Sequence, residues 1–227
     1  MKNILVIIKK QIKDTMKNTA VLIQFIIFPV LTLIMENAIK MDDMPPQFFT
    51  KLFSVMAIGM TTTSVAAIIS EEKEKNTLRV LMMSNVKPWE YLLGIGIYVW
   101  TICMLGAGLM STCLDKENIP FYLVVMGLGY MLSIVAGACV GIYAKNQMVA
   151  TSLAMPLMMI LSFLPMLALF NENIKKVARF FYTQQLRSIL DEMTFDSITR
   201  EGVIILAVNM IVVITAFFVI FRKKGLE

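Results

Sequence analysis

Six apolar segments, each about as long as a bilayer is thick, constrain this 227-residue sequence more than any other feature. A membrane-spanning helix needs about 20 mostly apolar residues. Hydrophobic residues make up 58% of the chain, against about 45–50% in soluble domains. The sequence therefore predicts an all-α, polytopic membrane helix bundle. The six expected spans are Ala20–Ile39, Phe48–Ile69, Pro88–Cys113, Ile119–Ala144, Met148–Phe170 and Gly202–Phe221.

The distribution of lysine and arginine predicts the orientation of these spans. Loops on the cytoplasmic side carry an excess of these residues. With the N-terminus inside, the inner segments hold 13 of them and the outer segments hold eight. Five of those eight lie in the single loop Asn171–Arg200. We therefore expect a multi-pass protein of the plasma membrane with both termini cytoplasmic. The net charge of +5 then reflects contact with lipid headgroups, and no nucleic-acid partner is expected.

Residues 1–18 are predicted to form an amphipathic helix that lies in the membrane surface. On a helical wheel one arc is apolar and the neighbouring arc is basic, which is typical of interfacial helices. The apolar arc consists of Ile4, Leu5, Ile8, Ile12 and Met16, and the basic arc consists of Lys2, Lys9, Lys10, Lys13 and Lys17.

Two further segments have distinctive patterns. The outer segment 171–200 shows helical spacing of apolar residues, which predicts short helices on the extracellular face before the last span. The fifth span contains Pro156 and Pro165. Because proline removes a backbone donor and clashes with the preceding turn, we expect this span to be interrupted near one of them.

A charged segment, Ser70–Gly94, separates the second and third spans. Ser70 is a plausible N-cap, and the glutamates that follow it favour the positive end of a helix. Leu78, Leu81 and Met82 would share one face of that helix. Pro88 suits the first turn of the next span. The segment thus predicts a short amphipathic cytoplasmic helix over residues 71–83.

The same stretch, "EEKEKNTLRVLMMSNVKPWEYLLG", resembles the segment after the second span of ABC-2 type permeases, the membrane subunits of type V ATP-binding-cassette exporters. The family pattern has acidic residues, Glu-x-Gly-Thr, a leucine-rich turn, a proline-containing stop and Leu-Leu-Gly-Lys. This sequence departs from it at Asn76, at Asn85-Val86 and at Ile95. The matching positions are Thr77, Leu78, Leu81, Leu92, Leu93 and Gly94.

The resemblance extends over nearly the whole chain and implies a single transmembrane domain, 1–227, that moves substrate with energy from a separate ATPase. The chain has no phosphate-binding loop of the G-x-x-x-x-G-K-[ST] type, so ATP and Mg would be bound by that partner and no cofactor by this chain. The helix 71–83 would be the coupling helix that docks on the ATPase, and a second copy or a paralogue would complete the transporter. The expected ATPase-coupling residues are Glu71, Glu72, Thr77, Leu78, Arg79, Leu81 and Met82.

The expected function is export of an amphipathic or hydrophobic substrate, such as a peptide, an antibiotic or a lipid-like compound, by a subunit that is not itself an enzyme. An intramembrane metalloprotease is excluded because the chain contains no histidine. A stand-alone carrier or channel for small hydrophobic compounds is the alternative. It is less favoured, because the centres of the spans offer almost no ionisable group for ion coupling. The residues that could line a pathway are Thr61, Thr62, Met155, Met159 and Phe163.

Overall fold

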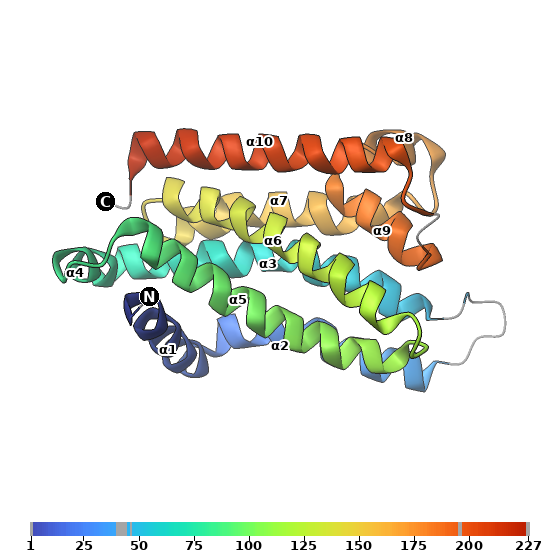
Figure 1. The fold of residues 1–227 in the computed structure, drawn as a ribbon, viewed down its shortest axis with the longest axis horizontal. Helices are drawn as coiled ribbons and strands as arrows, with labels where there is room; N and C mark the ends of the chain where they lie inside the picture. The colour runs from blue at the N-terminus through green and yellow to red at the C-terminus, as the bar shows by residue number, and fades with distance from the viewer. Residues whose placement is uncertain (1, 40–44, 46, 195–196, 226–227) are drawn as a thin grey trace.

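The computed structural model describes residues 2–39, 45, 47–194 and 197–225. Within these residues the chain is all-helical, with 86% helix and no strand. Figure 1 shows long helices side by side, with both termini and α4 at one end of the bundle, which we call the α4 end. The helices are α1 (Lys2–Lys17), α2 (Thr19–Ala38), α3 (Phe48–Glu74), α4 (Thr77–Met83), α5 (Pro88–Met110), the 3-10 turn η1 (Ser111–Cys113), α6 (Ile119–Tyr143), α7 (Gln147–Leu167), α8 (Glu172–Ala178), α9 (Tyr182–Glu192) and α10 (Arg200–Lys224).

The prediction of six membrane spans is confirmed. Helices α2, α3, α6, α7 and α10, and α5 together with η1, are long and apolar enough to cross a bilayer. The second span is longer than expected, because α3 continues to Glu74 instead of ending near Ile69. The amphipathic N-terminal helix is also present as α1.

Helix α3 is the centre of the bundle and contacts α2, α5, α6, α7 and α9. Its closest neighbour is α6, which presents small residues at four-residue spacing. A Cβ atom at Gly137 would lie 2.5 Å from the Thr62 carbonyl oxygen, and one at Gly141 would lie 2.8 Å from Ile69. Small residues let membrane helices approach closely, and the close packing then holds them together. The glycines of α6 therefore determine that α3 and α6 pack as a pair.

The expected interruption of the fifth span is wrong, because α7 is one continuous helix that includes both Pro156 and Pro165. Helix α7 packs against α3. At Gly59 of α3 the two backbones are so close that a Cβ atom would lie 2.0 Å from the Ser162 hydroxyl. Prolines are tolerated in membrane helices where neighbouring helices supply replacement contacts. Here tertiary packing outweighs the local cost of proline.

The prediction of short helices in the segment 171–200 is confirmed by α8 and α9. Helix α9 is inserted among α3, α6, α7 and α10, where the Tyr182 hydroxyl hydrogen-bonds Ser133 at 2.7 Å. The amide of Asn209 donates to the Phe180 carbonyl at 2.8 Å. Asn209 lies nine residues into α10, or about 13 Å along the helix axis. The connection between α8 and α9 therefore lies beside α10, about 13 Å along the helix axis from its first residue.

Candidate functional site

The charged segment folds differently from its prediction. A single helix over 71–83 with Ser70 as N-cap is wrong, because Ser70 lies inside α3 and its hydroxyl donates to the Ala67 carbonyl at 3.1 Å. The chain breaks instead at Asn76, whose φ is 55°. Asparagine, like glycine, tolerates this left-handed conformation. A new helix, α4, then begins at Thr77 and leads away from the end of α3.

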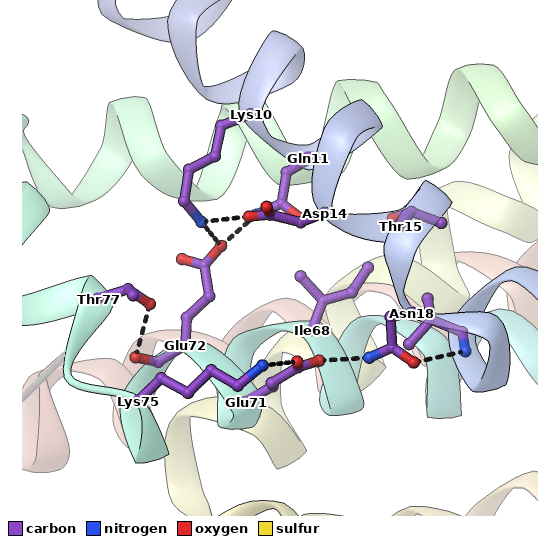
Figure 2. A pocket seen from close by; sticks show the side chains of 11 residues that line it. Lys10, Gln11, Asp14, Thr15, Asn18, Ile68, Glu71, Glu72, Lys75 and Thr77 are labelled. Atoms are coloured by element: carbon purple, nitrogen blue, oxygen red, sulfur yellow. Dashed lines mark hydrogen bonds and ion pairs between the residues drawn. The ribbon is translucent and has the colours of Figure 1, made fainter.

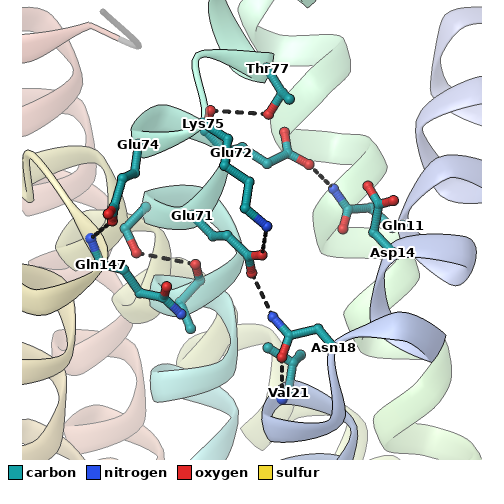
Figure 3. A network of polar contacts seen from close by, with 12 residues as sticks. Gln11, Asp14, Asn18, Val21, Glu71, Glu72, Glu74, Lys75, Thr77 and Gln147 are labelled. Carbon is teal, nitrogen blue, oxygen red and sulfur yellow. Dashed lines mark hydrogen bonds and ion pairs between the residues drawn. The ribbon is translucent and has the colours of Figure 1, made fainter.

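Glu71, Glu72 and Glu74 therefore lie in the last turn of α3, where they bind neighbouring elements (Figure 3). Glu74 accepts a hydrogen bond from the backbone amide of Gln147 at the start of α7, at 2.8 Å. Glu71 accepts from Asn18, which precedes α2, at 2.7 Å, and also pairs with Lys75. One helical turn thus attaches α3 to two other elements of the bundle.

Glu72 is the most enclosed of the three and attaches α1. Its side chain is 8% exposed. One of its oxygens accepts from Lys10 Nζ at 2.5 Å and from the amide of Gln11. A buried charge is costly unless it is paired and hydrogen-bonded, so these contacts fix α1 against α3. Sequence reasoning missed Lys10, Gln11 and Asn18 as partners of the glutamates.

The same carboxylates keep two lysines protonated. Burial acts to lower the pKa of Lys10, but hydrogen bonds and charge interactions with Glu72 and Asp14 outweigh it, so that this pKa is raised above 10.5. The hydrogen bond that Lys75 donates to the Glu71 carboxylate likewise raises the pKa of Lys75. Both lysines are therefore cationic at neutral pH.

Helix α1 has three faces rather than the expected two. Leu5, Ile12 and Met16, from the predicted apolar arc, are exposed, as contact with lipid requires. A third face packs on the bundle and consists of Asn3, Ile7, Gln11 and Thr15, at four-residue spacing. This spacing of amides and a hydroxyl was the available signal for a protein-facing stripe, since such a stripe recurs every turn.

Gly94, one of the positions of the family resemblance, gives α1 room to pack on α5. A Cβ atom at this position would lie 2.7 Å from the buried Ile7 side chain. At the same helix pair, the Asn3 amide donates to Glu90 at 2.9 Å. The absence of a side chain at Gly94 therefore allows α1 to pack closely on α5.

Helix α4 is amphipathic as predicted, but its apolar face is used by the chain itself. Leu78 is 1% exposed and belongs to the hydrophobic core, against which Leu81 and Met82 also pack. The opposite face carries Val80, 61% exposed, and Met83, 81% exposed. Of the seven expected coupling residues, Glu72 and Leu78 are buried, Arg79 is exposed, and Glu71, Thr77, Leu81 and Met82 are half-buried.

The five expected pathway residues do not meet at one surface. Thr61 and Thr62 are buried within α3, and Thr61 borders a cavity of only about 10 Å³ between α2, α3, α5 and α6. Met155, Met159 and Phe163 are exposed on the outer side of α7. A pathway inside a single copy is therefore not formed by these side chains together.

Comparison with known proteins agrees with this architecture. A family model described as ABC-2 family transporter protein matches residues 2–221. A search of curated proteins found no match. The family match includes all six spans, α1 and α4, so that it covers the elements built around the charged segment as well as the bundle. The chain therefore belongs to the ABC-2 family of membrane transporter proteins.

Proposed function

We propose that this protein is the permease subunit of an ATP-binding-cassette exporter that moves an amphipathic or hydrophobic substrate out of the cell. Members of this family normally pair with an ABC ATPase. In this proposal the α4 end faces the cytoplasm, in keeping with the excess of lysine and arginine in its segments. Both termini lie at that end, and the ATPase binds there.

The observation that supports docking is the position of α4. One face of α4 is fixed to the core by Leu78, while Val80 and Met83 on the other face are exposed. Only Lys75 and Asn76 separate α4 from α3, the helix that also contacts α2, α5, α6, α7 and α9. A displacement of α4 by an ATPase would therefore be transmitted to the centre of the bundle. The docking face is then Arg79, Val80 and Met83 rather than Leu78 and Leu81.

The pathway in this proposal forms between two permease copies. The exposed side chains of Met155, Met159 and Phe163 on α7 are available to line it, and methionine adapts to varied apolar partners. Thr61 and Thr62 would contribute to packing instead.

The test compares the double variant V80D/M83D with V177D, a matched aspartate at an exposed valine of α8. Insertion should be normal in all variants, because each replaced side chain is exposed. Burying an unpaired carboxylate in an apolar interface costs several kcal/mol, and each 1.4 kcal/mol lowers affinity about tenfold. V80D/M83D should therefore lose the ATPase, whereas V177D should keep it.

The measurements are co-purification of the ATPase from native membranes, ATP hydrolysis by the purified complex, and native mass spectrometry, which should find two permease copies per complex. Wild-type recovery and hydrolysis in V80D/M83D would show that α4 is not the docking helix. A complex with one permease copy and full transport would exclude the two-copy pathway. Replacing Leu78 with aspartate is a poor test, because Leu78 lies in the hydrophobic core and a carboxylate there would unfold α4.

A further inference from the structure

A cavity of about 10 Å³ lies inside the bundle, between α2, α3, α5 and α6. It differs from the larger cavity of Figure 2, at the α4 end, where side chains such as Lys10 and Glu72 pair with one another. A volume of about 10–15 Å³ is the least that holds one water molecule, and that water needs about two to four polar partners. The smaller cavity therefore has room for one water, and its polar groups decide whether one binds.

Tyr130 of α6 brings a hydroxyl to this cavity. The residue is 2% exposed and lines the cavity, and no described residue hydrogen-bonds its hydroxyl. The hydroxyl interacts electrostatically with the Cys103 thiol, which lies 3.5 Å from the Thr61 hydroxyl oxygen at the same cavity. Buried polar atoms are almost always paired. Tyr130 therefore has an O–H donor that the described protein groups leave unused.

A backbone acceptor is freed at the same place by a proline. Pro29 has no N–H, so it cannot donate to the Phe25 carbonyl one turn earlier in α2. The hydroxyl of Thr32, later in α2, donates to the Phe28 carbonyl instead, at 2.8 Å. The Phe25 carbonyl faces α5, where a Cβ atom at Gly106 would lie 3.8 Å from its oxygen. Ordered water is one of the ways in which membrane helices satisfy backbone groups that proline has freed.

We propose that this cavity binds one water molecule, which accepts a hydrogen bond from the Tyr130 hydroxyl and donates one to the Phe25 carbonyl. Its second O–H has two acceptors on α3. The hydroxyls of Thr61 and Ser64 line the cavity and donate to other groups at 2.9 and 2.8 Å, and each oxygen keeps lone pairs that can accept. A cation is disfavoured, because none of the described residues that line the cavity is charged.

This water joins α2, α3 and α6 in the interior of the bundle, and it accounts for the proline in α2. Without it, the Tyr130 donor and the Phe25 acceptor would both be buried unpaired, and an unpaired buried group costs its full desolvation penalty. The inference does not depend on the identity of the exported substrate or on ATPase docking.

The experiment fills the cavity and asks whether the protein gains or loses stability. In Gly106→Ala the added methyl group lies 3.0 Å from the Pro29 side chain at the cavity wall. In a dry cavity this methyl group adds contacts, whereas displacing a water leaves Tyr130 and Phe25 unpaired. Reversible unfolding of the full chain in bicelles should show the unfolding equilibrium constant rising about tenfold. The matched control is Gly108→Ala in the same helix, which meets nothing within 4 Å and should not raise it.

A second substitution separates loss of the water from steric pressure on Pro29. Steric pressure acts equally with and without the Tyr130 hydroxyl, whereas the hydrogen bonds of the water depend on it. Tyr130→Phe alone should raise the unfolding equilibrium constant about fivefold, and in this background Gly106→Ala should have a clearly smaller effect than in wild type. The control is Tyr122→Phe in α6, whose hydroxyl bonds Ser54 directly at 2.7 Å. It should leave the effect of Gly106→Ala unchanged.

If Gly106→Ala does not fold, a double-mutant cycle of Tyr130→Phe with the isosteric Thr61→Val takes its place. These two side chains do not hydrogen-bond each other, so coupling between them reports the bridging water. A structure at a resolution that shows ordered water should have density within hydrogen-bond distance of the Tyr130 hydroxyl and the Phe25 carbonyl. The proposal is overturned if Gly106→Ala stabilises the protein, if the cycle that is measured is additive, or if such density is missing.

Discussion

Helices α3 and α10 are both long and apolar enough to span a membrane, but they occupy opposite positions in the fold. The most apolar 18-residue window of α10 has a mean hydropathy of 3.0 and no buried residue, whereas that of α3 has a mean hydropathy of 1.9 and is 78% buried. In water the more apolar helix would be expected inside. In a bilayer the lipid is as apolar as leucine, so hydropathy gives no reason for a helix to leave it.

The buried position of α3 is explained by its small and polar side chains. Ser54 hydrogen-bonds Tyr122 of α6 at 2.7 Å, and Ser64 donates to Gln24 of α2 at 2.8 Å. Glu36 of α2 accepts from both the amide and the hydroxyl of Thr50, at 2.9 and 3.0 Å. Helix α10 uses mainly Asn209 for such a contact. The comparison teaches that, in this protein, polar contacts and close packing decide position, whereas apolar surface faces lipid.

The largest expected effect comes from truncating equivalent isoleucines in the two helices. Ile58→Ala in α3, where the side chain is fully buried, should cost about 2–5 kcal/mol through lost contacts and a cavity. Ile211→Ala in α10, 63% exposed, should cost less than about 0.5 kcal/mol. Reversible unfolding in bicelles measures both. If the two variants lost the same free energy of unfolding, Ile211 of α10 would be as closely packed as Ile58 of α3. The contrast between a buried α3 and a lipid-facing α10 would then be wrong.

The second effect tests close approach between helices rather than burial. Gly137→Ala places a methyl group 2.5 Å from the Thr62 carbonyl of α3, and such overpacking should cost about 1–3 kcal/mol. Gly108→Ala in α5 meets nothing within 4 Å and gains helix propensity, so it should be neutral or stabilising. The same unfolding assay applies. A neutral Gly137→Ala would mean that α3 and α6 are not held by their small residues.

The smallest effect concerns a single polar contact. Tyr182→Phe removes the hydrogen bond to Ser133, and bonds of this kind between membrane helices average about 0.6 kcal/mol. Hydrogen exchange should increase in α9 and leave α10 unchanged. Tyr143→Phe, at an exposed tyrosine in α6, is the control and should change neither. A double-mutant cycle with Ser133→Ala measures the coupling free energy between Tyr182 and Ser133. A coupling free energy of zero would mean that this hydrogen bond does not stabilise the position of α9.

The sequence alone determined the class of protein and most of its elements. The six apolar runs are each long enough to span a bilayer, and satisfying backbone polar groups in lipid leaves helices as the available structure for such runs. The amphipathic patterns of α1, α4 and α9 were also visible, because each has apolar residues at helical spacing. The family resemblance in residues 71–94 agrees with the family match over residues 2–221.

Only the tertiary structure decided how these elements are used. Glu71 and Glu72 looked like the start of a coupling helix, yet they end α3, because Asn76 takes a left-handed turn and because Lys10, Gln11 and Asn18 are there to bind them. Leu78 looked available to a partner, yet the core of the chain takes it. Local patterns specify that a face is apolar or charged. Which neighbour covers that face depends on contacts between residues far apart in the sequence, and these form only when the helices pack.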